Sequence, residues 1–230
     1  MIKRLQRLGL ILALFGLAFV VAGGYAFMKV QDGQKSLNAF SAAQAVKLSY
    51  NDQGQLVDRG ETAGAEAIMA LLRDDWQYPV NTAELNPNDP VVNTATEYMY
   101  QLATITYHTL NSTQTVVLPE DVTAADGTVY KAGEHKFEVD GRYWSQFNRA
   151  NPIEAAAREK AWTGTAHALI AELGVGTATA TSLQLGLGIA SLFAGVGFLA
   201  LISGLGLVWA TRAQEEPATR RVLRPSAIPA

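Results

Sequence analysis

Two long apolar runs stand at the ends of the chain and enclose a polar middle. Residues 8–28 contain no charged side chain, and neither do residues 173–211. A helix needs roughly 20 consecutive apolar residues to cross the hydrocarbon core of a bilayer. The pattern therefore predicts two transmembrane helices, at residues 8–28 and 179–210, with one extramembrane domain between them.

The middle of the chain, residues 29–178, alternates between helical and strand-like patterns. Helices are predicted at residues 37–45, 61–76, 93–110 and 152–173, a strand at 114–118, and hairpins at 46–60 and 128–139. Residues 104–110 are rich in β-branched side chains, so a strand is the alternative at the end of the helix 93–110. Thr62 is placed to cap the helix 61–76. Helices combined with hairpins indicate an α+β domain.

Three segments lack a regular pattern. Residues 29–36 are expected to form a short polar link after the first span. Small residues at 174–182 indicate a flexible hinge before the second span. The last segment, residues 211–230, contains three prolines and is expected to be a disordered tail.

Both predicted spans carry glycines at regular intervals. In the first span, Gly9, Gly16 and Gly23 recur every seven residues and share one face. In the second span, one face carries Gly186, Gly197 and Gly204, and the opposite face carries Gly188, Gly195 and Gly206. Small residues let helix backbones approach closely in lipid, so all nine are candidate helix-packing positions. The alternative is that glycine is simply common in membrane helices.

Charge divides the chain in the same way. Residues 1–7 carry a net charge of +3 and residues 211–230 a net charge of +2, whereas the middle holds 11 basic and 19 acidic residues, a net charge of -8. Basic residues beside membrane spans stay in the cytoplasm. The expected location is the plasma membrane, with residues 1–7 and 211–230 cytoplasmic and the acidic domain extracytoplasmic. Phosphates would be repelled by this domain, so no nucleic-acid partner is expected.

Residues 1–26 admit a second interpretation, a cleaved signal peptide. Gly24, Tyr25 and Ala26 have the small-x-small form of a cleavage site. The apolar run, however, is longer than the roughly 7–15 residues of a signal-peptide core, which favours an uncleaved anchor.

Residue types that carry enzyme chemistry are sparse. The chain has no cysteine, which excludes disulfides and thiolate metal sites. Its three histidines, His108, His135 and His167, lack the close histidine pairing of a metal-binding helix. The sequence contains no Walker A loop and no G-x-S-x-G elbow. We therefore expect no catalytic residue, metal or cofactor. One aromatic set, Tyr98, Tyr100, Tyr107, Tyr143 and Trp144, either lines a ligand groove or fills the core.

Three stretches carry a resemblance to known proteins. They are VVAGGYAFMKVQDGQKSLNAF, TEYMYQLATITYHTL and LQLGLGIASLFAGVGFLALISGLGLVW. Together they resemble a group of uncharacterised actinobacterial two-pass membrane proteins, over nearly the whole chain apart from the tail. Some of that group carry the label aromatic ring-opening dioxygenase, a chemistry that needs converging histidine and carboxylate ligands, and this sequence offers no recognisable pair. The resemblance implies a domain in the cell envelope of a Gram-positive-type bacterium.

These patterns lead to one principal hypothesis and two alternatives. The principal one is a non-enzymatic integral membrane accessory or interaction protein that presents an acidic extracytoplasmic domain. Its expected partners are the lipid bilayer and, through the glycine faces, another membrane protein or a second copy of the chain. The first alternative is an extracytoplasmic ligand-binding sensor or cell-envelope assembly module, and the second is an enzyme of unrecognised type. A buried, polar-lined pocket in the domain would favour ligand binding, and converging histidines and acids would favour an enzyme. A filled domain without a pocket, together with bare glycine faces in the membrane, would favour the accessory protein.

Overall fold

The chain forms two compact units in a computed structural model, which describes the backbone of residues 2–222 and the side chains of residues 2–212. One unit, here called the helix pair, comprises residues 2–36 and 182–222. The other, here called the domain, comprises residues 37–181. The fold is thus a small α+β region flanked by two long apolar helices.

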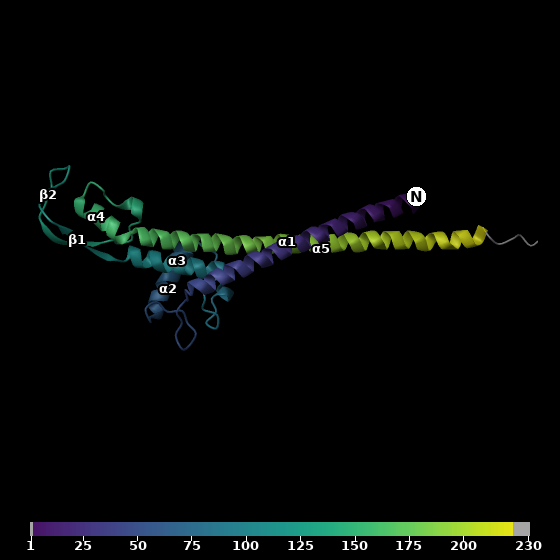
Figure 1. Cartoon of the computed structure of the whole chain (residues 1–230), viewed down its shortest axis with the longest axis horizontal. Coiled ribbons are helices and arrows are strands. Elements are labelled where there is room, and N and C mark those ends of the chain that lie inside the picture. The colour runs from purple at the N-terminus through teal and green to yellow at the C-terminus, as the bar shows by residue number, and fades with distance from the viewer. Residues whose placement is uncertain (1, 223–230) are drawn as a thin grey trace, which may run out of the picture. The chain divides into compact units, whose positions relative to one another are not determined.

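Helices dominate the chain, and the strands are short (Figure 1). The helices are α1 (Ile2–Gln44), α2 (Thr62–Ala70), α3 (Ala95–Leu110), α4 (Pro152–Ala161) and α5 (Gly164–Val222), with a π-helical turn at Leu71–Asp75 and 3₁₀ turns at Thr82–Glu84 and Trp144–Gln146. The strands are β1 (Thr113–Leu118), β2 (Val122–Thr123), β3 (Val129–Tyr130) and β4 (Gly133–Glu138).

Helices α1 and α5 are long and apolar enough to cross a membrane, by length and composition. In the most apolar 18-residue stretch of each helix, only a small share of the residues is buried inside the protein, 17% in α1 and 11% in α5. A helix in the core of a soluble protein would be covered on most of its surface. The exposed apolar side chains therefore fit a lipid environment better than water.

The predicted polar link and hinge are both wrong, because α1 and α5 continue through them as helix. In the link, the Lys29 ammonium nitrogen lies 3.9 Å from an Asp32 carboxylate oxygen, and the Ser36 hydroxyl donates to the Asp32 backbone carbonyl. In the hinge segment, the Thr177 and Thr179 hydroxyls donate to carbonyls one turn earlier, which satisfies their polar groups within the helix.

The predicted tail also begins as helix rather than as disordered chain. Helix α5 continues to Val222, and residues 223–230 lie outside the described residues. Alanine, arginine, glutamine and glutamate favour helix, and a helix that is already nucleated extends at little further cost.

The predicted helices of the domain are present, with changed boundaries. The helix 61–76 is divided into α2 and a π-helical turn, and Glu61 rather than Thr62 is its N-cap residue. Residues 104–110 belong to α3, so the strand alternative there is wrong. The helix 152–173 is interrupted at Trp162 and Thr163, where the Trp162 indole donates to the Arg142 carbonyl and Thr163 caps α5 through the Ala166 amide.

The first predicted hairpin forms its turn but not its strands. Residues 46–60 contain the isolated bridge Tyr50↔Leu56, and the Asn51 amide donates to the Gln55 carbonyl. This short segment closes a loop but does not extend into a ladder.

The second predicted hairpin is paired differently from our expectation. Strand β4 pairs antiparallel with β1, from Thr113↔Glu138 to Leu118↔Gly133, whereas β3 pairs with β2. The turn between β2 and β3 contains Asp126 and Gly127, with Gly127 at a φ of +86°. Asp-Gly is a strong turn signal, and this turn, not the one near Gly133, closes the hairpin.

The core of the domain has two parts. Val116 and Leu118 of β1 pack against Ala157 of α4. Ile68 of α2 and Leu72 in the following turn are fully buried, and α2 contacts α3. Helix α3 is thus the central helix of this region.

Helix α3 begins with a capping box that contains a buried carboxylate. The Glu97 side chain is 2% exposed, and one of its oxygens accepts hydrogen bonds from the amides of Asn93 and Thr94 and from the Thr94 hydroxyl. Burial raises the pKa of Glu97 above its ordinary value, and the backbone hydrogen bonds oppose that shift. The carboxylate satisfies amides at the start of α3 that would otherwise be buried without acceptors.

Replacing Glu97 with alanine should lower the free energy of unfolding of the domain by about 1–3 kcal/mol, because two amides lose their acceptor. Glu97→Gln keeps one acceptor oxygen and should cost less. The measurement is thermal unfolding followed by near-UV circular dichroism, with hydrogen exchange of the first α3 amides. An unchanged free energy of unfolding in Glu97→Ala would show that the cap is unimportant.

The wild-type protein and the Glu97→Gln variant together test the pKa of Glu97. Because the folded pKa is raised, the folded state binds more protons than the unfolded state between the two pKa values, so stability falls as pH rises through that window. This decrease should be smaller in Glu97→Gln. An unchanged pH profile would contradict the raised pKa.

Candidate functional site

Helices α1 and α5 lie antiparallel in the helix pair and meet at glycines (Figure 1). A methyl group placed on Gly9 would lie 2.7 Å from the Gly204 carbonyl oxygen, and one on Gly23 would lie 2.7 Å from the Ala194 amide nitrogen. Such a group on Gly16 would overlap the Leu201 amide nitrogen. No side chain longer than hydrogen fits at these three positions without a shift of the partner helix.

Helix α5 contributes the matching glycines on its own side of the contact. A methyl group on Gly197 would lie 2.7 Å from the Val20 amide nitrogen, and one on Gly204 would lie 2.5 Å from the Ala13 amide nitrogen. Gly186 contacts the Val30 side chain. Ring contacts add to the backbone contacts, since Phe19 and Phe193 pack edge to face with centroids 5.4 Å apart.

The other glycine face of α5 is open within the described residues. A methyl group on Gly188, Gly195 or Gly206 would find no atom within 4 Å. Large apolar side chains beside these glycines are exposed, namely Leu192, Leu199 and Ile202. We call this surface the open α5 face. The α1 helix therefore occupies one of the two glycine faces of α5 and leaves the other uncovered.

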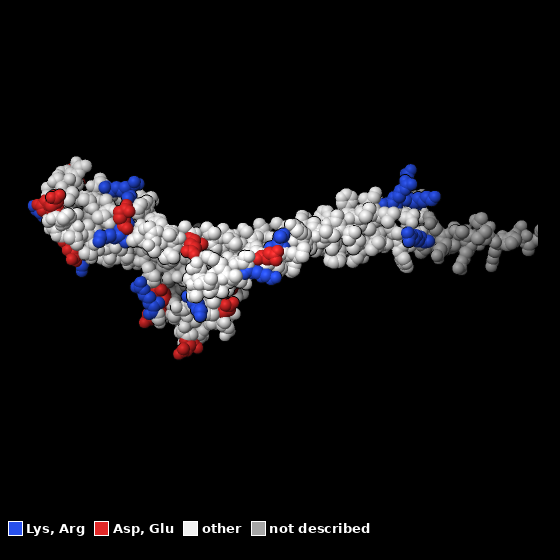
Figure 2. All heavy atoms as spheres, viewed as in Figure 1, with Lys and Arg blue, Asp and Glu red and all other residues white. Residues whose placement is uncertain are grey.

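Charge is confined to the ends of the helix pair. Figure 2 shows Lys and Arg where α1 begins and an uncharged surface along the following part of the pair. The apolar band corresponds to the uncharged residues 8–28 and 182–211. The open α5 face lies within this band.

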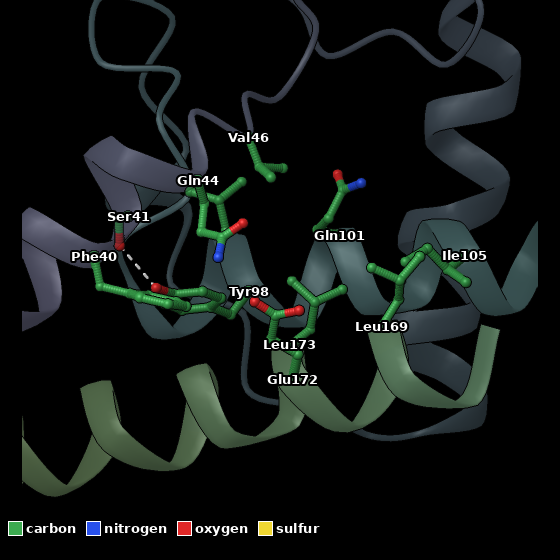
Figure 3. A pocket seen from close by; sticks show the side chains of 11 residues that line it. Phe40, Ser41, Gln44, Val46, Tyr98, Gln101, Ile105, Leu169, Glu172 and Leu173 are labelled. Carbon is green, nitrogen blue, oxygen red and sulfur yellow. Dashed lines mark hydrogen bonds between the residues drawn. The ribbon is translucent and has the colours of Figure 1, made fainter. Parts of the chain in front are cut away.

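The domain contains a cavity of about 240 Å³ (Figure 3). Its walls come from the end of α1, from α3 and from the beginning of α5, together with Val46 and Val92. Apolar side chains form most of the lining, namely Phe40, Val46, Val92, Ile105, Leu169 and Leu173. Polar side chains in the lining are Ser41, Gln44, Tyr98, Gln101 and Glu172.

Tyr98 fixes one wall of this cavity. Its hydroxyl lies 2.8 Å from the Ser41 hydroxyl, and both side chains are buried (Figure 3). Its ring lies against Gly176, where a methyl group would come 2.5 Å from the ring. Gly176, which we had expected to form part of a hinge, is thus a close contact between α5 and α3.

Two further tyrosine hydroxyls are buried in the domain. The hydroxyls of Tyr50 and Tyr100 are buried and make no hydrogen bond within the described residues. Burial raises the pKa of both phenols, with further contributions from the negative charges of Glu97 for Tyr50 and Asp58 for Tyr100. Both phenols therefore stay protonated at physiological pH.

The predicted aromatic set does not gather at one groove. Tyr98 lines the cavity, whereas Tyr143 stacks on Trp162 with centroids 5.8 Å apart, and the Arg158 guanidinium lies 4.0 Å above the Trp144 ring. The sequence had not pointed to the α1 and α5 residues of the cavity. The sequence feature that indicates this region is Glu172, because it is the last charged residue before the second apolar run.

The three histidines lie apart, and each has a local partner. His108 lies 2.9 Å from an Asp58 carboxylate oxygen, while His135 and His167 contact the backbone carbonyls of Lys131 and Thr163. Among the described residues, no three histidine or carboxylate side chains are grouped to hold a metal ion.

Comparison with protein-family models, curated proteins and solved structures found no match for this chain.

The pairing of α1 with α5 is testable by cross-linking, because the chain has no cysteine of its own. The variant Phe19→Cys/Phe193→Cys should be joined by a short bifunctional thiol reagent, since the two rings are in contact. Val21→Cys/Phe193→Cys is the control, because Val21 is 64% exposed and lies two residues along α1 from Phe19. The joined peptides are detected by mass spectrometry, and equal yields in the two variants would contradict the pairing.

Proposed function

We propose that this protein is a non-enzymatic, two-pass membrane accessory protein that holds an acidic domain outside the cytoplasm and binds a membrane partner through the open α5 face. The observation that carries the proposal is the unequal use of the two glycine faces of α5. Helix α1 packs on the face with Gly197 and Gly204, whereas no described residue packs on the face with Gly188 and Gly195. A second copy of the chain or another membrane protein would supply the missing helix.

Physical chemistry supports a contact at this face. Lipid tails are as apolar as leucine, so helices in a bilayer associate through close packing rather than through burial from water. Gly188 and Gly195 alternate along this face with the exposed side chains of Leu192 and Leu199. A partner helix would gain backbone approach at the glycines and side-chain contact at the leucines.

The orientation in the proposal follows from charge. Basic residues dominate the segments 1–7 and 211–230, and the segment between the spans is acidic. Both termini are then cytoplasmic, and the domain is extracytoplasmic. The resemblance to actinobacterial two-pass proteins is in line with this arrangement.

Ligand binding by the domain is a second candidate function, and the cavity favours it. Cavities that bind small molecules are largely apolar and have a few polar groups that orient the ligand. The cavity beside Tyr98 has both properties. An accessory protein and a ligand-binding sensor are compatible, since the two sites belong to different units of the chain.

The proposed topology predicts the labelling of single cysteines in intact cells. Ala125→Cys, which lies in the exposed turn between β2 and β3, should react with a membrane-impermeant maleimide. Gln6→Cys should react only after the membrane is made permeable. The reverse pattern would overturn the orientation.

The proposed partner contact predicts different outcomes for glycines on the two faces of α5. Gly195→Leu should cause the loss of the complex on blue native gels while the Phe19–Phe193 cross-link is retained. Gly204→Leu should instead reduce that cross-link, because its side chain would overlap α1.

Gly24→Leu is the control for glycine replacement in a span, since Gly24 has no atom within 4 Å of an added methyl group and lies on α1. It should leave both the complex and the cross-link intact. A complex that survives Gly195→Leu would count against the accessory function. So would a wild-type protein that migrates on blue native gels as a single chain.

A further inference from the structure

The cavity of the domain has an apolar interior and a polar rim. The Ser41 and Tyr98 hydroxyls bond to each other, so they add no free polar group to the interior. Gln44 and Glu172 are exposed, and Gln101 is half-buried. Figure 3 shows no hydrogen bond from these three to the other lining side chains, and within the described residues their side chains make no hydrogen bond or ion pair elsewhere. A ligand would therefore meet apolar walls inside and unused polar groups at the edge.

The charge at the rim selects among amphiphiles. Among the described residues, the lining includes one carboxylate, on Glu172, and no lysine, arginine or histidine. An anionic head group would meet a like charge without a compensating cation. A cationic amine would form a charge-assisted hydrogen bond with Glu172, and the amide groups of Gln44 and Gln101 are available for further hydrogen bonds.

The interior has the size and the chemistry to bind an apolar group. Apolar cavities of roughly 150 Å³ stay free of water and bind molecules such as benzene. The present cavity, at about 240 Å³, is larger and opens to the surface, since Phe40, Val46 and Leu169 in its lining are exposed whereas Leu173 is buried. The Ser41 and Tyr98 hydroxyls in its wall are paired with each other.

We propose that this cavity binds an amphiphile with an apolar chain and a cationic amine head, with the chain between α1, α3 and α5 and the head at Glu172. The inference rests on the second proposed function, ligand binding by the domain, and adds the chemical class of the ligand. The shared chemistry fits an amine-bearing lipid and a soluble alkylamine alike.

The experiment is photoaffinity labelling of the full chain in its own membranes. The probes are octylamine, octanol and octanoate, each with a diazirine in the chain, and labelled peptides are identified by mass spectrometry. The spans will be labelled from the bilayer by all probes. The informative peptides are those that contain residues 40–46, 98–105 and 169–173. Octylamine should label them most, octanol less and octanoate least.

Two matched pairs of proteins make the test specific. Val46→Trp fills the cavity wall and should reduce labelling of these peptides by about tenfold, as expected for the loss of a buried apolar contact. Val117→Trp makes the same change at an exposed position of β1, away from the cavity, and should have no effect. Glu172→Gln should reduce the preference for octylamine over octanol by about tenfold, the size of one charge-assisted hydrogen bond, and retain octanol labelling.

The outcomes separate the two levels of the proposal. If octanoate labels the cavity as well as octylamine, the domain binds ligands but the amine selectivity is wrong. If no probe labels the cavity above the level in Val46→Trp, ligand binding itself is wrong. Extraction of the purified protein then distinguishes the sources, since a co-purified amine lipid that is lost in Val46→Trp identifies the membrane as the supply. Labelling by octylamine without such a lipid identifies a soluble ligand.

Discussion

The closest approach of α1 to α5 is the contact on which the helix pair depends. In lipid there is little hydrophobic driving force between helices, so their association depends on how near the backbones can come. Gly9, Gly16 and Gly23 of α1 lie against the backbone of α5, and a methyl group at any of the three would overlap that backbone. The heptad spacing of these glycines keeps the contact on one side of α1 along the pair.

This contact determines which surface of α5 is left for other molecules. Because α1 packs on the side of Gly197 and Gly204, the opposite side with Gly188 and Gly195 is uncovered. Glycine lowers helix propensity relative to alanine in water, although it is common in membrane helices. The proposed accessory function would give the second glycine face a neighbour of its own.

Sequence reasoning succeeded where a local period carries the structure and failed where a tertiary contact overrides propensity. The apolar runs and the two sets of α5 glycines follow from helical geometry alone. The hinge at 174–182 was inferred from low helix propensity, but Gly176 is there to receive the Tyr98 ring, so the segment stays helical. The hairpin predicted at 128–139 is wrong because Asp126-Gly127 is a stronger turn signal than Ala132-Gly133 and pairs β2 with β3.

The cavity was beyond sequence reasoning because its walls come from segments far apart in the chain. Phe40, Tyr98 and Leu173 share no period, and only folding brings them together. The single charge at its rim can nevertheless be interpreted in physical terms. Glu172 is exposed, so its carboxylate remains in contact with water and avoids the desolvation penalty of a buried charge. It can therefore discriminate between head groups at the entrance while the interior remains apolar, which is the division that an amphiphile requires.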